Sequence, residues 1–194
     1  MESEDEARLL GRAAKGDTEA FRKIFEDHHL AMFRFAYRLA GAVDIAEDVT
    51  QECFLQLVRK PGFNQQRGSL RQYLYGIVRN LVRQRQNASD REVNCDDLPI
   101  DDQKFTAAGC PDSITSVELN AVVQAAISAL PPLQREAIVL CEFEELSLRE
   151  AAAIVGTDVG TIKSRLHRAR ERLRCQLAPY RSQLRTPLSR GTIL

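Results

Sequence analysis

The 194-residue sequence lacks the features that usually mark a secreted or membrane-spanning protein. Its first residues, MESEDEARLL, are acidic and have no apolar core of the kind found in a secretory signal. No apolar run reaches the length that spans a bilayer. The five cysteines are odd in number and form no CxxC pair, so free thiols in a reducing compartment are expected. We therefore expect a cytoplasmic protein.

Metal-binding and catalytic patterns are also missing. Histidine is scarce, and the spacings of His28, His29 and the cysteines do not match a zinc-binding motif. No motif brings a histidine, a cysteine and a carboxylate together as a catalytic set. We expect no metal, no cofactor and no enzymatic activity. The cysteines are either small buried side chains or include a redox-sensing thiol, and both interpretations stay open.

The formal net charge is zero, but the charges are distributed in blocks. Residues 59–91 are almost exclusively basic among the charged types, and residues 92–118 are almost exclusively acidic. From Arg149 onward basic residues dominate again. This alternation indicates two segments that face nucleic acid, separated by an acidic linker.

The most specific pattern lies between Ser147 and Arg174. Ser147 followed by Glu150 predicts a capping box at the start of a short helix, and Gly156 is typical of the turn that ends it. Asp158 is a good N-cap for a second helix. Apolar residues at helical spacing then predict its inner face: Ile162, Leu166, Ala169 and Leu173. Two short helices around a glycine turn indicate a helix-turn-helix.

The outer face of the second helix is basic and polar. It carries Thr161, Lys163, Ser164, Arg165, His167 and Arg168. Because these side chains suit the major groove of DNA, they are the candidate DNA-reading residues. The competing interpretation is an arginine-rich amphipathic helix that only faces solvent.

Residues 8–86 predict further helices. Asp17 or Thr18 begins one that is rich in aromatic residues and ends at Gly41, and Asp44 begins another. Opposite the apolar stripe of the latter lies a compact acidic and amide patch: Asp44, Glu47, Asp48, Gln51, Glu52 and Gln56. We expect a docking surface there, although an ordinary solvated helix face would have the same composition.

A third helix begins after the polar loop 63–69. Its inner stripe includes Tyr73, whereas basic, aromatic and amide residues of the helix and loop are expected outside: Phe63, Asn64, Arg71, Tyr75, Arg79, Asn80 and Arg83. Such a mixture suits single-stranded nucleic acid, because cations track phosphates and aromatic rings stack on bases. Alternatively the tyrosines belong to the core or its rim, which we expect of Tyr73.

No strand pattern is present, so the predicted fold is all-α. We expect two small helical domains, 8–86 and 114–177, joined by a flexible acidic linker at 87–113 and followed by a tail at 178–194. The second domain contains the helix-turn-helix.

Both halves resemble one family, the extracytoplasmic-function (ECF) sigma factors of bacterial RNA polymerase. DIAEDVTQECFLQLV resembles the family's polymerase-docking helix, and SLRQYLYGIVRNLVR resembles its promoter-melting, −10-reading helix. The C-terminal stretch, above all GTIKSRLHRAR, resembles its −35-reading domain. Tyr73 stands where the family often has tryptophan.

The resemblance implies a non-enzymatic bacterial factor that binds core RNA polymerase through its two largest subunits, reads promoter DNA and helps melt it. An anti-sigma factor is an expected partner. Two alternatives stay open: a decoy that binds only an anti-sigma factor, and a helix-turn-helix regulator with an unrelated N-terminal domain. The basic faces argue against the first, and the acidic patch argues against the second.

Overall fold

The computed structural model describes residues 3–59, 62–89 and 115–180, and all regular elements in these ranges are helical. This confirms the all-α fold class. The elements are α1 (Ser3–Ala13), α2 (Thr18–Ala40), α3 (Val43–Arg59), η1 (Gln65–Arg67), α4 (Leu70–Ser89), α5 (Ser116–Ser128), α6 (Pro132–Ile138), η2 (Val139–Phe143), α7 (Leu148–Val155), α8 (Val159–Gln176) and η3 (Ala178–Tyr180). None of these helices is long and apolar enough to cross a membrane.

The N-terminal half consists of α1 to α4, and α2 is its central helix. Asp17 is the N-cap of α2, since its carboxylate accepts a hydrogen bond from the Ala20 amide at 3.1 Å. Gly41 ends the helix in the left-handed conformation, with φ 77°. Helices α1, α3 and α4 pack on α2 and bury its apolar face, which contains Ile24, Met32 and Phe35. Both helix ends were predictable from the sequence.

The C-terminal half consists of α5 to α8. Pro132 occupies the first turn of α6, where its missing N–H costs nothing. The helix then widens into the π-helical turn η2, and Glu145 follows with a positive φ of 56°. Helices α6 and α7 pack against α8, whose buried residues are Ile162, Leu166 and Ala169. The predicted inner face of α8 is confirmed at these three positions.

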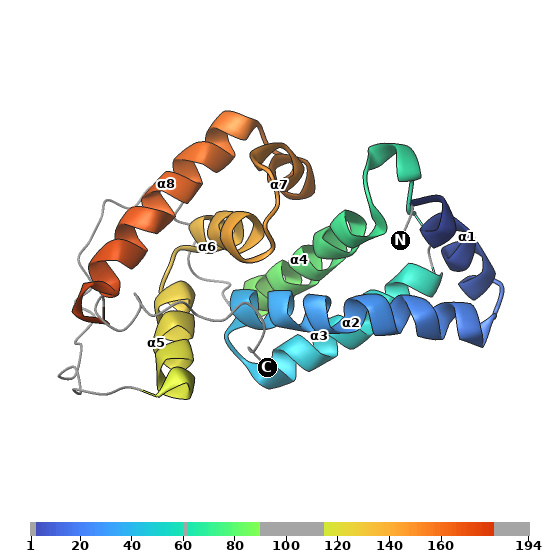
Figure 1. The fold of residues 1–194 in the computed structure, drawn as a ribbon, viewed down its shortest axis with the longest axis horizontal. Coiled ribbons are helices and arrows are strands. Elements are labelled where there is room, and N and C mark those ends of the chain that lie inside the picture. The colour runs from blue at the N-terminus through green and yellow to red at the C-terminus, as the bar shows by residue number, and fades with distance from the viewer. Residues whose placement is uncertain (1–2, 60–61, 90–114, 181–194) are drawn as a thin grey trace.

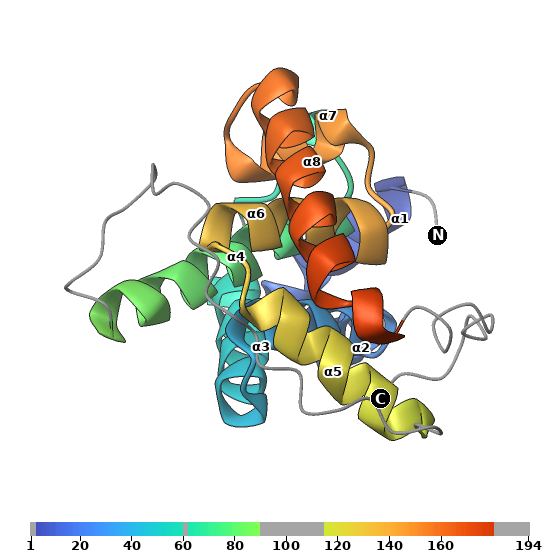
Figure 2. The same ribbon diagram turned by 90° about the vertical axis from the view of Figure 1, so that its left-hand side faces the viewer.

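The two halves pack against each other, although the sequence predicted domains on a tether. Figures 1 and 2 show α5 to α8 lying against the N-terminal helices, with α7 next to α4 and α5 next to α2. Buried side chains of both halves form one continuous core. The predicted linker lies almost entirely outside the described residues, as does the tail beyond Tyr180, and Tyr180 itself is buried.

Candidate nucleic-acid interface

The helix-turn-helix is held by the caps that its sequence predicts. Ser147 and Glu150 form a reciprocal capping box, in which the Ser147 amide donates to the Glu150 carboxylate at 2.8 Å. Gly156 closes α7 with φ 75°, and Asp158 accepts from the Thr161 amide at 2.8 Å to begin α8. These contacts fix where the outward-facing side chains of α8 begin.

The outer face of α8 is open to solvent as predicted. Lys163, Ser164, His167 and Arg168 are exposed, whereas Thr161 and Arg165 are half-buried at its edges. Two hydroxyls of the set already have partners: Thr161 donates to the Asp158 carboxylate, and Ser164 donates to the Thr161 carbonyl at 2.9 Å. The cations therefore dominate what this face offers to a ligand.

The two acidic caps of the motif are stabilised in their charged forms. The hydrogen bond from the Thr161 hydroxyl lowers the pKa of Asp158, and the hydrogen bonds from Ser147 lower the pKa of Glu150. Because each carboxylate lies at a helix N-terminus, the helix dipole also favours its negative charge. The motif therefore keeps its caps at neutral pH.

The second candidate surface lies along α4, and here the structure corrects the sequence prediction. Arg71, Tyr75, Arg79 and Arg83 recur every four residues and form one row, which we name the α4 row. It was expected to face solvent. Instead Tyr75 is fully buried and Arg79 is 6% exposed, whereas Arg71 and Arg83 remain exposed. The row is covered because the C-terminal half packs over it.

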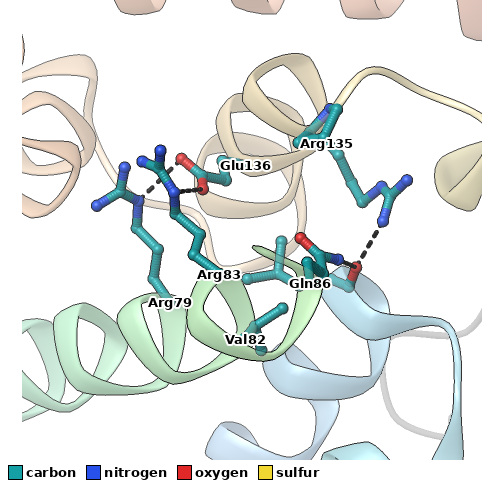
Figure 3. A pocket seen from close by; sticks show the side chains of 8 residues that line it. Arg79, Val82, Arg83, Gln86, Arg135 and Glu136 are labelled. Carbon is teal, nitrogen blue, oxygen red and sulfur yellow. Dashed lines mark hydrogen bonds and ion pairs between the residues drawn. The ribbon is translucent and has the colours of Figure 1, made fainter. Parts of the chain in front are cut away.

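Two glutamates of the C-terminal half contact the α4 row. Glu136 of α6 accepts a hydrogen bond from Arg79 Nε at 2.8 Å and lies 4.0 Å from Arg83 Nε. Figure 3 shows both arginines directed at this carboxylate. Glu144, just after η2, accepts from the Tyr75 hydroxyl and lies 3.3 Å from Arg71. Burial raises the pKa of Tyr75, and the neighbouring Glu144 adds to that shift.

The other residues assigned to this surface have different surroundings. Asn80 is exposed on α4. Phe63 is half-buried, and its ring lies 5.8 Å from the ring of Tyr73. Asn64 caps the turn η1 by accepting from the Gln66 amide at 2.9 Å, so its side chain already has a structural role. The loop therefore lies beside α4 with its aromatic side chain partly sheltered.

The acidic patch on α3 is on the surface, as predicted. Asp44, Glu47, Asp48 and Gln51 are exposed, and Glu52 and Gln56 are half-buried and hydrogen-bonded to each other at 3.2 Å. Asp48 forms an ion pair with Arg85 of α4 at 3.2 Å. Because the pair is exposed, it contributes little to stability and leaves Asp48 available to another cation.

The three cysteines of the described ranges differ in exposure: Cys53 is buried, Cys141 is half-buried and Cys175 is exposed. No group of three potential ligands occurs in that part of the chain. Cys53 is buried, and this burial raises the pKa of its thiol to about 12, so it behaves as a small apolar side chain. Burial also raises the pKa of Cys141. Cys95 and Cys110 lie outside the described residues.

Sequence reasoning missed the residues that join the two halves. Besides Glu136 and Glu144, these include Arg38, which lies 3.4 Å from Glu144, and Arg135, which donates to the Leu39 carbonyl at 2.7 Å. Nothing in the local pattern distinguishes them from charged residues on a solvated helix. Their partners lie up to about a hundred positions away in the sequence, for example Arg38 and Glu144.

Two family models match the chain, one in each half. Residues 24–92 match the model for sigma-70 region 2, and residues 121–173 match the model for sigma-70 region 4. Over 175 residues the chain is 37% identical to the ECF RNA polymerase sigma factor SigE of Mycolicibacterium smegmatis, covering 88% of this chain and 67% of the relative. It is 36% identical over 179 residues to SigW of Bacillus subtilis, covering 88% and 95%.

A solved structure is also similar. The sigma factor RpoE of Bartonella quintana, in a complex with the anti-sigma factor NepR, superposes with a TM-score of 0.60 at 28% identity. The match covers 81% of this chain and 96% of that one. The region 2 match contains α3 and α4, and the region 4 match contains the helix-turn-helix. The chain thus belongs to the ECF RNA polymerase sigma factors of the sigma-70 family.

Proposed function

We propose that three surfaces of this sigma factor share the work of promoter-specific transcription initiation, on α8, on α4 with the loop before it, and on α3. The observation that carries the proposal is the exposed basic face of a doubly capped α8. Its cations suit phosphates and guanine edges in a major groove, so we assign it to the −35 element. The residues are Thr161, Lys163, Ser164, Arg165, His167 and Arg168, within a region 4 domain that we place at 114–177.

The region 2 domain, which we place at 8–86, would hold the −10 element. Aromatic rings and cations on α4 and the preceding loop suit a single strand whose bases have left the duplex. We assign this role to Phe63, Asn64, Arg71, Asn80 and Arg83, which the structure leaves exposed or half-buried. Tyr75 and Arg79 are buried in this structure, so a role for them requires the C-terminal half to move away. Two modest DNA contacts held on one polymerase then act together, because the second forms at a high effective concentration.

The acidic patch on α3 would bind core RNA polymerase. Exposed carboxylates on one helix face suit a basic partner surface, and only weak internal ion pairs compete for them. The partners would be the two largest polymerase subunits, and an anti-sigma factor is a further expected partner. The similar Bartonella protein was solved with one. We infer that the chain acts in the bacterial cytoplasm and that it is not an enzyme.

Reconstituted transcription tests the proposal. The purified chain and core polymerase should initiate from specific sites on fragmented genomic DNA from the source bacterium. In the double variant Asp48→Arg and Glu52→Arg, core binding should weaken by at least roughly tenfold, because several close charge pairs become repulsive. The matched control reverses Glu19 and Glu26, two exposed carboxylates of α2.

Three outcomes decide between the possibilities. Weak core binding in the α3 variant alone supports the docking assignment. An equal loss in both double variants would mean that only overall charge matters. A wild-type chain that never binds core polymerase, yet captures an anti-sigma factor, would be the decoy instead.

A further inference from the structure

The start of α4 receives a hydrogen bond from α1. The Leu70 amide donates to Glu6 Oε2 at 3.3 Å, and the two residues are 64 positions apart in the sequence. Figure 1 shows α1 beside the turn that precedes α4, and α1 contacts both that turn and α4. An amide in the first turn of a helix has no partner within its own helix. Glu6 therefore completes the hydrogen bonding at the entrance of α4 from outside that helix.

The other contacts at this entrance are local. The Ser69 amide donates to Gln72 Oε1 at 3.2 Å, and the Gln72 amide donates to Ser69 Oγ at 3.3 Å. Gly68 precedes this pair with φ 142°, and a Cβ there would clash with Gln72 Oε1, so only glycine fits. The chain thus enters α4 in one defined conformation, to which Glu6 adds a long-range contact.

The Glu6 carboxylate is buried, which is costly for a charged group. Glu6 is 8% exposed, and its other oxygen lies 3.8 Å from Nε2 of His28 on α2. Burial of a carboxylate is unfavourable unless hydrogen bonds and nearby charges stabilise it. An exposed serine or aspartate next to the helix would satisfy the Leu70 amide at a lower cost. What the buried carboxylate adds over such a local cap is a fixed placement of α1 and α2 against the entrance of α4.

Electrostatics also favour a carboxylate that reaches this entrance from the buried side. Negative charge stabilises the N-terminus of a helix, yet the first turn of α4 carries no acidic residue. A carboxylate on the outer side of that turn would repel DNA phosphates near the exposed Arg71. Glu6 instead supplies its charge next to Leu70, which is fully buried. The entrance is thus stabilised without an acidic group on the surface that we assign to DNA.

The entrance of α4 in turn places the side chains of the preceding loop. The Phe63 ring lies 5.8 Å from the ring of Tyr73, which belongs to the first turn of α4. Asn64 caps the adjoining turn η1, and the Gly68 amide joins η1 to the entrance by donating to the Gln65 carbonyl at 3.5 Å. Both loop residues of the proposed −10 surface therefore depend on the backbone that Glu6 holds.

We propose that Glu6 is a positioning residue for −10 recognition. From α1 it holds the entrance of α4, and with it the loop 63–69, in the conformation that receives the −10 strand. Because it is buried, it acts through this backbone and does not contact the DNA. The inference rests on the proposed assignment of α4 and this loop to the −10 element. Without Glu6 the loop adopts several conformations, of which only a fraction fits the bases.

The test uses variants of the full chain in a holoenzyme with core polymerase. Glu6→Ala removes the acceptor, whereas Glu6→Gln keeps an oxygen that accepts from the Leu70 amide. Asp5→Ala is the matched control, since it removes an exposed carboxylate from the neighbouring position of α1. Two templates compete in one transcription reaction: a promoter that the wild type uses, and the same promoter with one −10 base changed. The ratio of their transcripts is the −10 ratio, and a second pair that differs only at −35 gives the −35 ratio.

Glu6→Ala should lower the −10 ratio roughly three- to tenfold, because only the matched template needs the placed loop. Glu6→Gln and Asp5→Ala should keep it within about twofold of the wild type, and the −35 ratio should stay within about twofold in every variant, because the −35 surface is a separate site. Both templates encounter the same folded protein, so a loss of stability alone changes neither ratio.

Several results would overturn the positioning role. These are an unchanged −10 ratio in Glu6→Ala, an equal fall of the −10 and −35 ratios, and an equal fall of the −10 ratio in Asp5→Ala or Glu6→Gln. If Glu6→Ala does not fold, Glu6→Asp replaces it, because a carboxylate that is one methylene shorter no longer reaches the Leu70 amide.

Phe63→Ala separates this inference from the proposed function. If Phe63→Ala lowers the −10 ratio and Glu6→Ala does not, only the positioning role is refuted. If Phe63→Ala leaves the −10 ratio unchanged, the assignment of the loop to the −10 element is itself wrong.

Discussion

Replacing Arg135 by lysine is a sharp test of how the two halves are held together. The Arg135 guanidinium donates to three carbonyl oxygens: Leu39 at the end of α2, at 2.7 Å, Leu130 at 3.0 Å, and Ser128 at the end of α5. The oxygens at the two helix ends belong to carbonyls that have no partner within their own helix. One side chain therefore satisfies acceptors in both halves. Figure 3 shows Arg135 beside the α4 contact.

The expected magnitude follows from this geometry. A lysine ammonium keeps the positive charge but cannot reproduce the planar fork, so about two of the three hydrogen bonds are lost. A hydrogen bond to a charged group contributes about 1.5–3 kcal/mol, and partial rehydration of the carbonyls reduces the loss. We expect the free energy of unfolding to fall by about 2–3 kcal/mol. Burial lowers the pKa of Arg135, and a lysine there would tolerate that burial less well.

Urea unfolding followed by circular dichroism measures the effect. With a slope of about 2–3 kcal/mol per molar urea, the midpoint should fall by about 1 M. Arg174→Lys is the matched control, since Arg174 is exposed and pairs only with Glu171 one turn away. If both variants shift the midpoint equally, or Arg135→Lys shifts it by less than about 0.2 M, the three-carbonyl contact does not form in solution.

Three further changes test separate parts of the molecule. Ser147→Ala removes one partner of the capping box and should lower the free energy of unfolding by about 1 kcal/mol, measured by urea titration. Arg165→Ala should reduce discrimination between matched and altered −35 sequences by about 1–3 kcal/mol in competition binding. An unchanged preference would mean that Arg165 does not contact the −35 base edges. Burial lowers the pKa of His28 below its ordinary 6.5, so the unfolded chain takes up the proton first. Stability is then complete above that value and falls as the solution is acidified below it, a decline that His28→Gln should lack just below about pH 6.5.

The helix ends and inner faces could be predicted because they depend on neighbouring residues. Asp17, Asp158 and the pair Ser147 and Glu150 act on amides within three positions of themselves. The stripe of α8 depends only on the period of the helix. The same local reasoning placed the acidic patch of α3 on the surface, where the structure has it.

The burial of the α4 row could not be predicted in this way. Period alone places Tyr75 and Arg79 on the side of α4 away from Leu74, Ile77 and Leu81, and only long-range packing decides what covers that side. Their partners, Glu144 and Glu136, lie 69 and 57 positions away. The π-turn that precedes Glu144 also has no recognisable signal in the local sequence.

The contact between the α4 row and the C-terminal half leaves an excess of positive charge. Four arginines meet two carboxylates: Arg38, Arg71, Arg79 and Arg83 against Glu136 and Glu144. The two carboxylates therefore neutralise only part of the positive charge. The excess lies at the ends of the α4 row, where the side chains of Arg71 and Arg83 are 48% and 45% exposed.

An approaching polyanion can engage these two ends while Tyr75 and Arg79 are covered, because the exposed guanidinium groups attract it without any change in the packing of the two halves. This contact should weaken as salt is added, because salt screens exposed charges most strongly. If the affinity for a labelled single-stranded oligonucleotide did not change with salt, the exposed arginines would not be the site of the contact.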